Sequence, residues 1–70
     1  MNNIYRTERL QQLELVKRQL QCAEETFTEI RNIGRKADAG VVDEQVCTNA
    51  IKELKEWIDW SEHQIGELSS

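Results

Sequence analysis

Few side chains in this sequence could do chemistry, and none of them forms a recognisable catalytic pattern. His63 lies four residues after Asp59, a spacing that brings two side chains together on a helix as a general base or a partial metal site. Ser61 and Thr48 carry hydroxyl groups but have no nucleophile motif around them. No phosphate-binding glycine loop is present. We therefore predict a non-enzymatic protein without a cofactor or metal, with His63 as a solvated histidine.

Two cysteines, Cys22 and Cys47, are too few to hold together a secreted mini-protein. The N-terminal residues lack the apolar segment of a signal peptide, which favours a reducing cytoplasmic location and free thiols. We expect both thiols to be buried or half-buried and to act as small apolar groups.

The tryptophans are the strongest candidates for a binding site. Trp57 and Trp60 stand three residues apart, among the carboxylates of Glu53, Glu56 and Asp59. Trp57 is expected to pack across an oligomer interface. Trp60 has two interpretations, which are burial in a homo-oligomer or an outward aromatic anchor with an acidic rim for a partner protein.

The first half of the chain has the apolar spacing of a helix with one buried face. Apolar residues recur every three or four positions, at Leu10, Leu13, Val16, Leu20, Ala23, Phe27 and Ile30. Gly34 comes shortly after the last of them, as glycine commonly does at the C-terminus of a helix. The pattern predicts a helix over about residues 4–33.

The second half repeats this spacing and is interrupted only by Ser61. The periodic positions are Cys47, Ile51, Leu54, Ile58, Ser61, Ile65 and Leu68. Asp43 is suited to cap the N-terminus of this helix. The pattern predicts a helix over about residues 43–67, with a loop at 34–42 that has a glycine near each end.

Two such helices joined by a short loop predict an all-α fold, an antiparallel two-helix hairpin that forms one domain over residues 1–70. The expected alignment places residue 33 near residue 43. Cys22 and Cys47 would then lie about seven residues, or ~10 Å, apart along the axis, which is too far for an intrachain disulfide.

A hairpin of this kind has more apolar surface than its two helices can cover for each other. Val46, Ala50 and Trp57 flank the periodic positions of the second helix. We therefore predict that two hairpins associate as a homodimer, a four-helix bundle. The predicted self-association seam is Leu13, Val16, Leu20, Phe27, Ile30, Ile51, Leu54, Ile58 and Ile65. A hairpin that is stable alone, or that docks onto a different protein, is the alternative.

The charge distribution narrows the classes of partner. The net charge is −4, and residues 43–70 hold seven carboxylates against two lysines. This balance disfavours nucleic acid as a partner. The basic residues Arg31, Arg35 and Lys36 near the loop fit compensation of the helix dipole. No run of 18 apolar residues is present, so we expect no membrane partner.

The expected function is that of a small interaction protein that associates with itself and regulates another protein by binding it. The partner's surface is expected to be basic. A structural oligomer without a separate partner site is one alternative. Another is an acidic charge mimic that inhibits a nucleic-acid-binding protein. Small size and acidity suit a bacterial or bacteriophage modulator, although no motif points to that origin.

Overall fold

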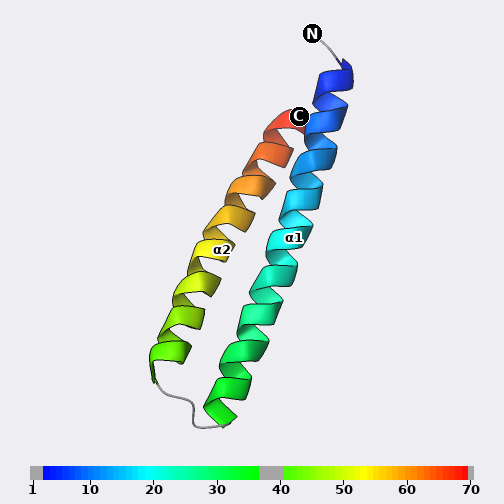
Figure 1. Ribbon diagram of the computed structural model, residues 1–70. Coiled ribbons are helices and arrows are strands. Elements are labelled where there is room, and N and C mark those ends of the chain that lie inside the picture. Colours follow the sequence, from blue (N-terminus) through cyan, green and yellow to red (C-terminus); the bar gives the residue numbers. More distant parts are fainter. Residues whose placement is uncertain (1–2, 37–40, 70) are drawn as a thin grey trace.

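The computed structural model describes residues 3–36 and 41–69, which form two long helices. Helix α1 spans Asn3–Lys36 and helix α2 spans Val41–Ser69. The helices run antiparallel and side by side, so both chain ends lie at the same end of the rod (Figure 1). The rod measures 55 × 14 × 13 Å. The predicted all-α helical hairpin is confirmed.

The predicted helix boundaries were too short at the closed end of the hairpin. Helix α1 continues through Gly34 to Lys36, and α2 begins at Val41, so Asp43 is not the residue that precedes the helix. Capping preferences are worth only about 1 kcal/mol. In the longer helices, the Arg35 guanidinium in the last turn of α1 binds Glu44 of α2. Residues 37–40 of the predicted loop lie outside the described residues.

Four polar contacts between the helices fix their alignment. They join Arg35 to Glu44, Arg31 to Thr48, Glu24 to Lys55 and Lys17 to Glu62, and the two residue numbers add up to 79 in every pair. Residue 33 is therefore level with residue 46. The predicted alignment, with residue 33 near residue 43, was wrong by three residues.

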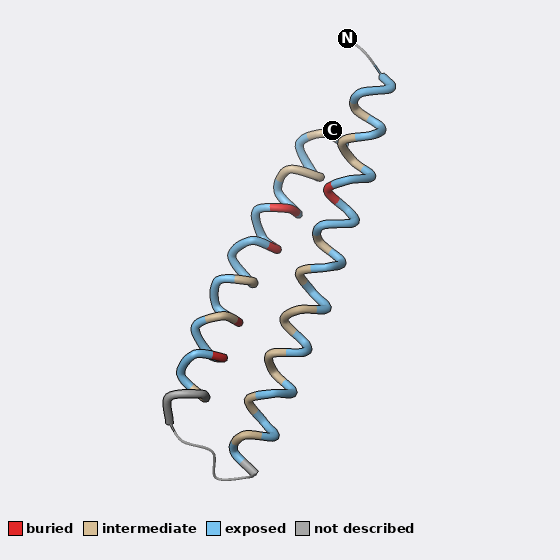
Figure 2. Tube along the Cα trace, viewed as in Figure 1, coloured by how far each residue is buried: buried red, intermediate tan, exposed pale blue. Residues whose placement is uncertain are grey.

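The periodic positions predicted for α2 do face α1. Ile51, Ile58 and Cys47 are buried, Ser61 is completely buried, and Leu54 and Ile65 are half-buried. These residues lie on the side of α2 that faces α1 in Figure 2. Neither α1 nor α2 contains an apolar stretch long enough to cross a membrane.

In α1 only part of the predicted seam faces α2. Leu13 is buried and Leu20 and Phe27 are half-buried, as expected. Val16 and Ile30 are 40% and 49% exposed, so their predicted place between the two helices was wrong. Whether a second copy covers them stays a prediction.

The side of α1 that faces α2 is more polar than the sequence suggested. The half-buried and buried positions that recur by four and three are Arg6, Leu10, Leu13, Lys17, Leu20, Glu24, Phe27, Arg31 and Gly34. The long side chains of Lys17 and Arg31 can cover apolar surface with their methylene groups while their charged ends stay in water. Helix α1 is thus rotated so that Val16 and Ile30 of its aliphatic row are exposed, while Ala23 of the same row is half-buried.

Candidate functional site

One side of the hairpin carries a row of charged contacts between the helices. Lys17 Nζ lies 3.6 Å from Glu62 Oε1, and Lys55 Nζ lies 4.0 Å from Glu24 Oε1. Arg31 donates a weak hydrogen bond of 3.4 Å to the Thr48 hydroxyl. These contacts recur every seven residues, so they share one side of the hairpin. We call this side the charged face.

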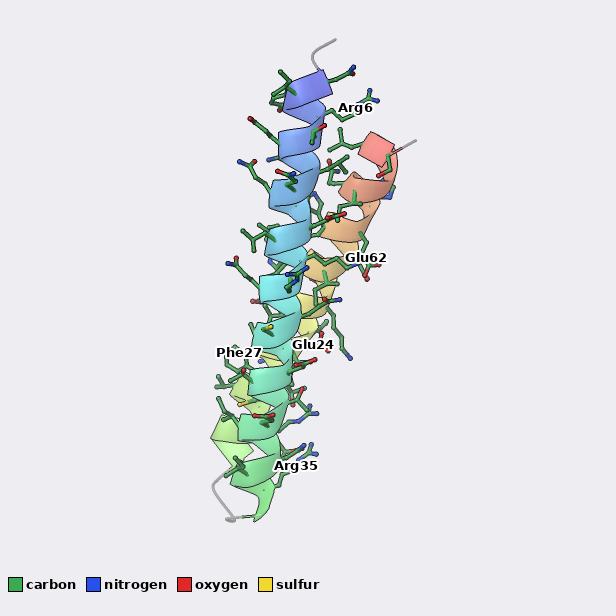
Figure 3. The ribbon with its side chains drawn as sticks, turned by 90° about the vertical axis from the view of Figure 1, so that its right-hand side faces the viewer. Arg6, Glu24, Phe27, Arg35 and Glu62 are labelled. Atoms are coloured by element: carbon green, nitrogen blue, oxygen red, sulfur yellow. The ribbon has the colours of Figure 1, made fainter. Side chains whose placement is uncertain are left out.

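Figure 3 shows the two sides of the seam. In this view α1 lies in front of α2, and the labelled side chains of Glu24, Arg35 and Glu62 lie on the right of the hairpin. Phe27 lies toward the left. The labelled charged side chains of the contacts between the helices therefore lie on the side of the hairpin away from Phe27.

The side opposite the charged face contains almost no charge. A step of one residue turns a helix by about 100°, so Val16, Ala23 and Ile30 lie across the seam from Lys17, Glu24 and Arg31. In α2 the corresponding row is Ala50, Trp57 and Gln64. On each helix a second row of residues lies next to this one, on the side away from the other helix. The full set is Gln12, Val16, Gln19, Ala23, Thr26, Ile30 and Ile33 of α1, with Val46, Ala50, Glu53, Trp57, Trp60, Gln64 and Glu67 of α2. We call it the tryptophan face.

Glu53 and Glu67 are the charged residues on the tryptophan face, although 31% of the whole sequence is charged. The large apolar side chains on this face remain accessible. Ile33, Val46 and Trp57 are each more than half exposed. The register places Ile33 level with Val46, so the two helices form one continuous apolar surface at the closed end. Contiguous exposed apolar surface of this kind is uncommon on monomeric proteins.

The two tryptophans form an edge-to-face pair near the middle of α2. Their ring centroids lie 5.9 Å apart, with an angle of 80° between the ring planes. Trp57 is 56% exposed and Trp60 is 41% exposed. The buried hydroxyl of Ser61 donates a 2.9 Å hydrogen bond to the carbonyl oxygen of Trp57. The seam of the hairpin thus holds the backbone that presents the indole rings.

The structure brings together four of the five predicted partner-binding residues. Glu53, Glu56, Trp57 and Trp60 line one shallow depression on the outer side of α2. Asp59 lies elsewhere and lines a groove on the charged face with Arg31, Lys52 and Lys55. Glu56 borders both the depression and the groove.

Two of the acidic residues around the tryptophans, Glu56 and Asp59, share a groove with Lys52 and Lys55 but do not pair with them. Within the described part of the chain, Glu53, Glu56 and Asp59 form no ion pair. Glu44 and Glu62 by contrast are paired with Arg35 and Lys17. The depression therefore combines an aromatic wall with unpaired carboxylates, a combination that attracts a positively charged group.

His63 is solvent-exposed, as predicted, and does not pair with Asp59. His63 Nε2 lies 3.0 Å from Glu67 Oε1, one turn further along α2, and the imidazole is largely exposed. Lys55, four residues before Asp59, contacts Glu24 of α1 instead. Among the described residues, no group of three or more histidine, cysteine or carboxylate side chains is arranged to hold a metal ion.

The cysteines differ in their surroundings. Cys47 is buried, as predicted, whereas Cys22 is exposed, so the prediction of two buried or half-buried thiols was wrong for Cys22. Because residue 22 is level with residue 57, the cysteines lie ten residues apart along the rod, or about 15 Å at helical rise. Both thiols are free.

The contacts of the charged face were missed by the sequence analysis, although a signal was present. Lys17, Glu24 and Arg31 recur every seven residues in α1, as do Thr48, Lys55 and Glu62 in α2. Read in opposite directions, the two series match positive with negative at two of three levels. That match would have indicated both the register and the rotation of α1.

Comparisons with known proteins give no further guide to the site. No protein-family model, no curated protein and no solved structure matches the chain.

Proposed function

We propose that this protein is a non-enzymatic helical interaction protein that associates with itself and regulates another protein by binding it. The observation that carries the proposal is the exposed Trp57–Trp60 pair, which shares a depression with the unpaired carboxylates of Glu53 and Glu56. The large aromatic anchors of binding sites are commonly tryptophans at well-shaped surface positions.

The chemistry of the depression selects a basic partner. A guanidinium or ammonium group above an exposed indole gains about 0.5–1 kcal/mol from the ring, and a carboxylate beside it adds charge pairing. Trp60, Glu53 and Glu56 lie on the outer side of α2, where an incoming chain can reach them. An arginine-bearing segment of a partner protein is the class of ligand that this arrangement fits.

Titration with a short arginine-rich peptide tests this assignment. We expect binding to quench the tryptophan fluorescence and to weaken as salt is raised, because exposed charge pairs are screened. Trp60→Ala should abolish binding, and Glu53→Gln combined with Glu56→Gln should weaken it strongly. Leu15→Ala, an exposed apolar position on α1 outside both faces, is the matched control and should bind like the natural chain.

A second experiment identifies the partner. Immobilised protein is used to capture partners from its native host, and the captured proteins are compared between the natural chain, Trp60→Ala and Leu15→Ala. The proposal requires a basic protein that is retained by the natural chain and Leu15→Ala but lost with Trp60→Ala, while helicity and oligomeric mass stay unchanged. If arginine-rich peptides bind equally to Trp60→Ala, the assignment of the depression is wrong.

A purely structural or assembly role is a second candidate, and the tryptophan face favours it. Two-helix hairpins have a thin core, and here only Leu13, Cys47, Ile51 and Ile58 are buried apolar residues among those described. Association would extend this core. Leu54→Asp should then disrupt the assembly and remove all activity, while Trp60→Ala should have no effect unless it disrupts the assembly.

A further inference from the structure

We infer that the tryptophan face binds a second copy of this chain about a two-fold axis parallel to the helices, with Trp57 of each copy packed over Ala23 of the other. The inference rests on the self-association part of the proposed function and adds the surface, the orientation and the contact. Both closed ends lie at the same end of the resulting four-helix bundle.

The size of the tryptophan face meets the need of a specific dimer. From Gln12 to Ile33 the face extends about 32 Å at 1.5 Å per residue. Two helices packed at 8–10 Å between axes present a width of about 18–20 Å. The footprint is therefore about 600 Å² per copy, or about 1,200 Å² in total, which is at the lower end of the range for specific interfaces.

Charge separates the two faces of the hairpin as candidates for this contact. In a two-fold dimer the same surface of both copies forms the contact. A charged surface would therefore bury its charges or place like charges next to each other. The tryptophan face carries two charged residues, Glu53 and Glu67, whereas the charged face carries Lys17, Glu24, Arg31 and their partners. Contact through the tryptophan face leaves the ion pairs in water.

Charge also selects the orientation of the two copies. Residues 1–33 carry no net charge, while residues 43–70 carry −5. An axis parallel to the helices places α1 of one copy on α2 of the other and sets the two acidic helices on a diagonal. An axis perpendicular to the helices would place α2 against α2 and set the two acidic helices against each other. The parallel axis avoids that repulsion.

Side-chain size along the face agrees with the parallel axis. A rotation about this axis does not shift residues along the rod. Each residue of α1 in one copy therefore meets the same residues of α2 in the other copy that lie level with it in its own chain. Trp57 then faces Ala23, and Ile30 faces Ala50, because level residues have numbers that add up to about 79. Large side chains meet small ones at both levels, as close packing between helices requires.

The arrangement covers part of the partner site and leaves its outer part accessible. Trp57 borders the seam and becomes covered by the second copy. Trp60, Glu53 and Glu56 lie at the outer side of α2, at the rim of the contact. The dimer would therefore present two partner sites on opposite sides of the bundle.

Disulfide pairing between two different variants tests the orientation. Both are made in a chain with Cys22→Ser and Cys47→Ala; one carries Thr26→Cys and the other Glu53→Cys, at positions that are level across the proposed contact. On mild oxidation of a mixture we expect a covalent dimer of one variant with the other, identified by mass, at a yield at least tenfold above either variant with itself. A dominant homodimer of either variant would contradict the parallel axis and overturn the inference, as would the absence of any covalent dimer.

Light scattering over a dilution series tests the contact itself. The natural chain should have the mass of a dimer at high concentration, and its tryptophan emission should shift to the red on dilution as Trp57 becomes exposed. Ala23→Leu, which fills the space beneath Trp57, should raise the dimer dissociation constant at least tenfold, while Gln21→Leu outside the tryptophan face should not. A monomer at all concentrations would overturn the inference but leave the arginine-peptide result standing, so the two proposals fail separately.

Discussion

Arg35 near the end of α1 donates two hydrogen bonds to a single carboxylate oxygen of Glu44 near the start of α2. The distances to Glu44 Oε1 are 2.9 Å from Nε and 2.6 Å from the terminal nitrogen. This contact lies next to the closed end of the hairpin and belongs to the same register as the pairs at Lys17 and Lys55. It sets how far α1 runs before the chain turns.

Replacing Arg35 with alanine should lower the free energy of unfolding by less than about 1 kcal/mol, because both partners are about half exposed. The loss should be greatest at low salt and vanish near 1 M salt. Urea denaturation of Arg35→Ala, Glu44→Ala and the double variant measures the coupling. Arg18→Ala, which removes an arginine without an ion pair in the described structure, is the control. Additive losses in the double variant would contradict the pairing.

Leu13 and Leu15 form a matched pair for testing the rotation of α1. Leu13 is 3% exposed and Leu15 is 54% exposed. Leu13→Ala should lower the free energy of unfolding by about 2–4 kcal/mol, while Leu15→Ala should change it by less than about 0.5 kcal/mol. Urea denaturation at one fixed chain concentration compares the two, since dimerisation makes stability depend on concentration. Equal losses would show that α1 does not face α2 as described.

Ser61 occupies a seam position with no space for a larger side chain. It is 0% exposed, and its hydroxyl is bonded within its own helix, to Trp57 O. Ser61→Ala should change the free energy of unfolding only slightly, because the hydroxyl and its acceptor belong to the same turn. Ser61→Leu should cost about 1–3 kcal/mol through overpacking. Thermal unfolding with Ser69→Leu as the exposed control tests this, and a stabilising Ser61→Leu would reveal an unfilled cavity.

The two thiols should react at very different rates. Exposed Cys22 should be modified by a thiol reagent as soon as it is mixed with the native protein, whereas buried Cys47 should react only on local or global unfolding. Mild oxidation should give no intrachain disulfide, because the thiols are about 15 Å apart along the rod. Mass spectrometry after timed labelling gives both results. Rapid formation of an intrachain bridge would contradict the register.

The sequence by itself determined that the chain forms two helices in a hairpin. The periodic apolar positions of α2 from Cys47 to Ile65 were predicted correctly, including Ser61 in the seam, because a repeat of three and four residues marks one helix face wherever it packs. The neighbourhood of Trp57 and Trp60 followed from helical spacing alone, since residues three apart lie side by side.

Only the tertiary structure decided the register and the rotation of α1. Apolar residues in α1 form a stripe wider than one seam, so hydrophobicity alone allowed Val16 and Ile30 to face α2. The charged pairs at Lys17 and Glu24 select a different rotation, in which α2 buries its own seam and both of these α1 residues are left exposed. Hydrophobic attraction has no direction and tolerates several alignments. Ion pairs between the helices form only where residues of opposite charge lie level with each other. The alignment that they favour therefore depends on the sequences of both helices together.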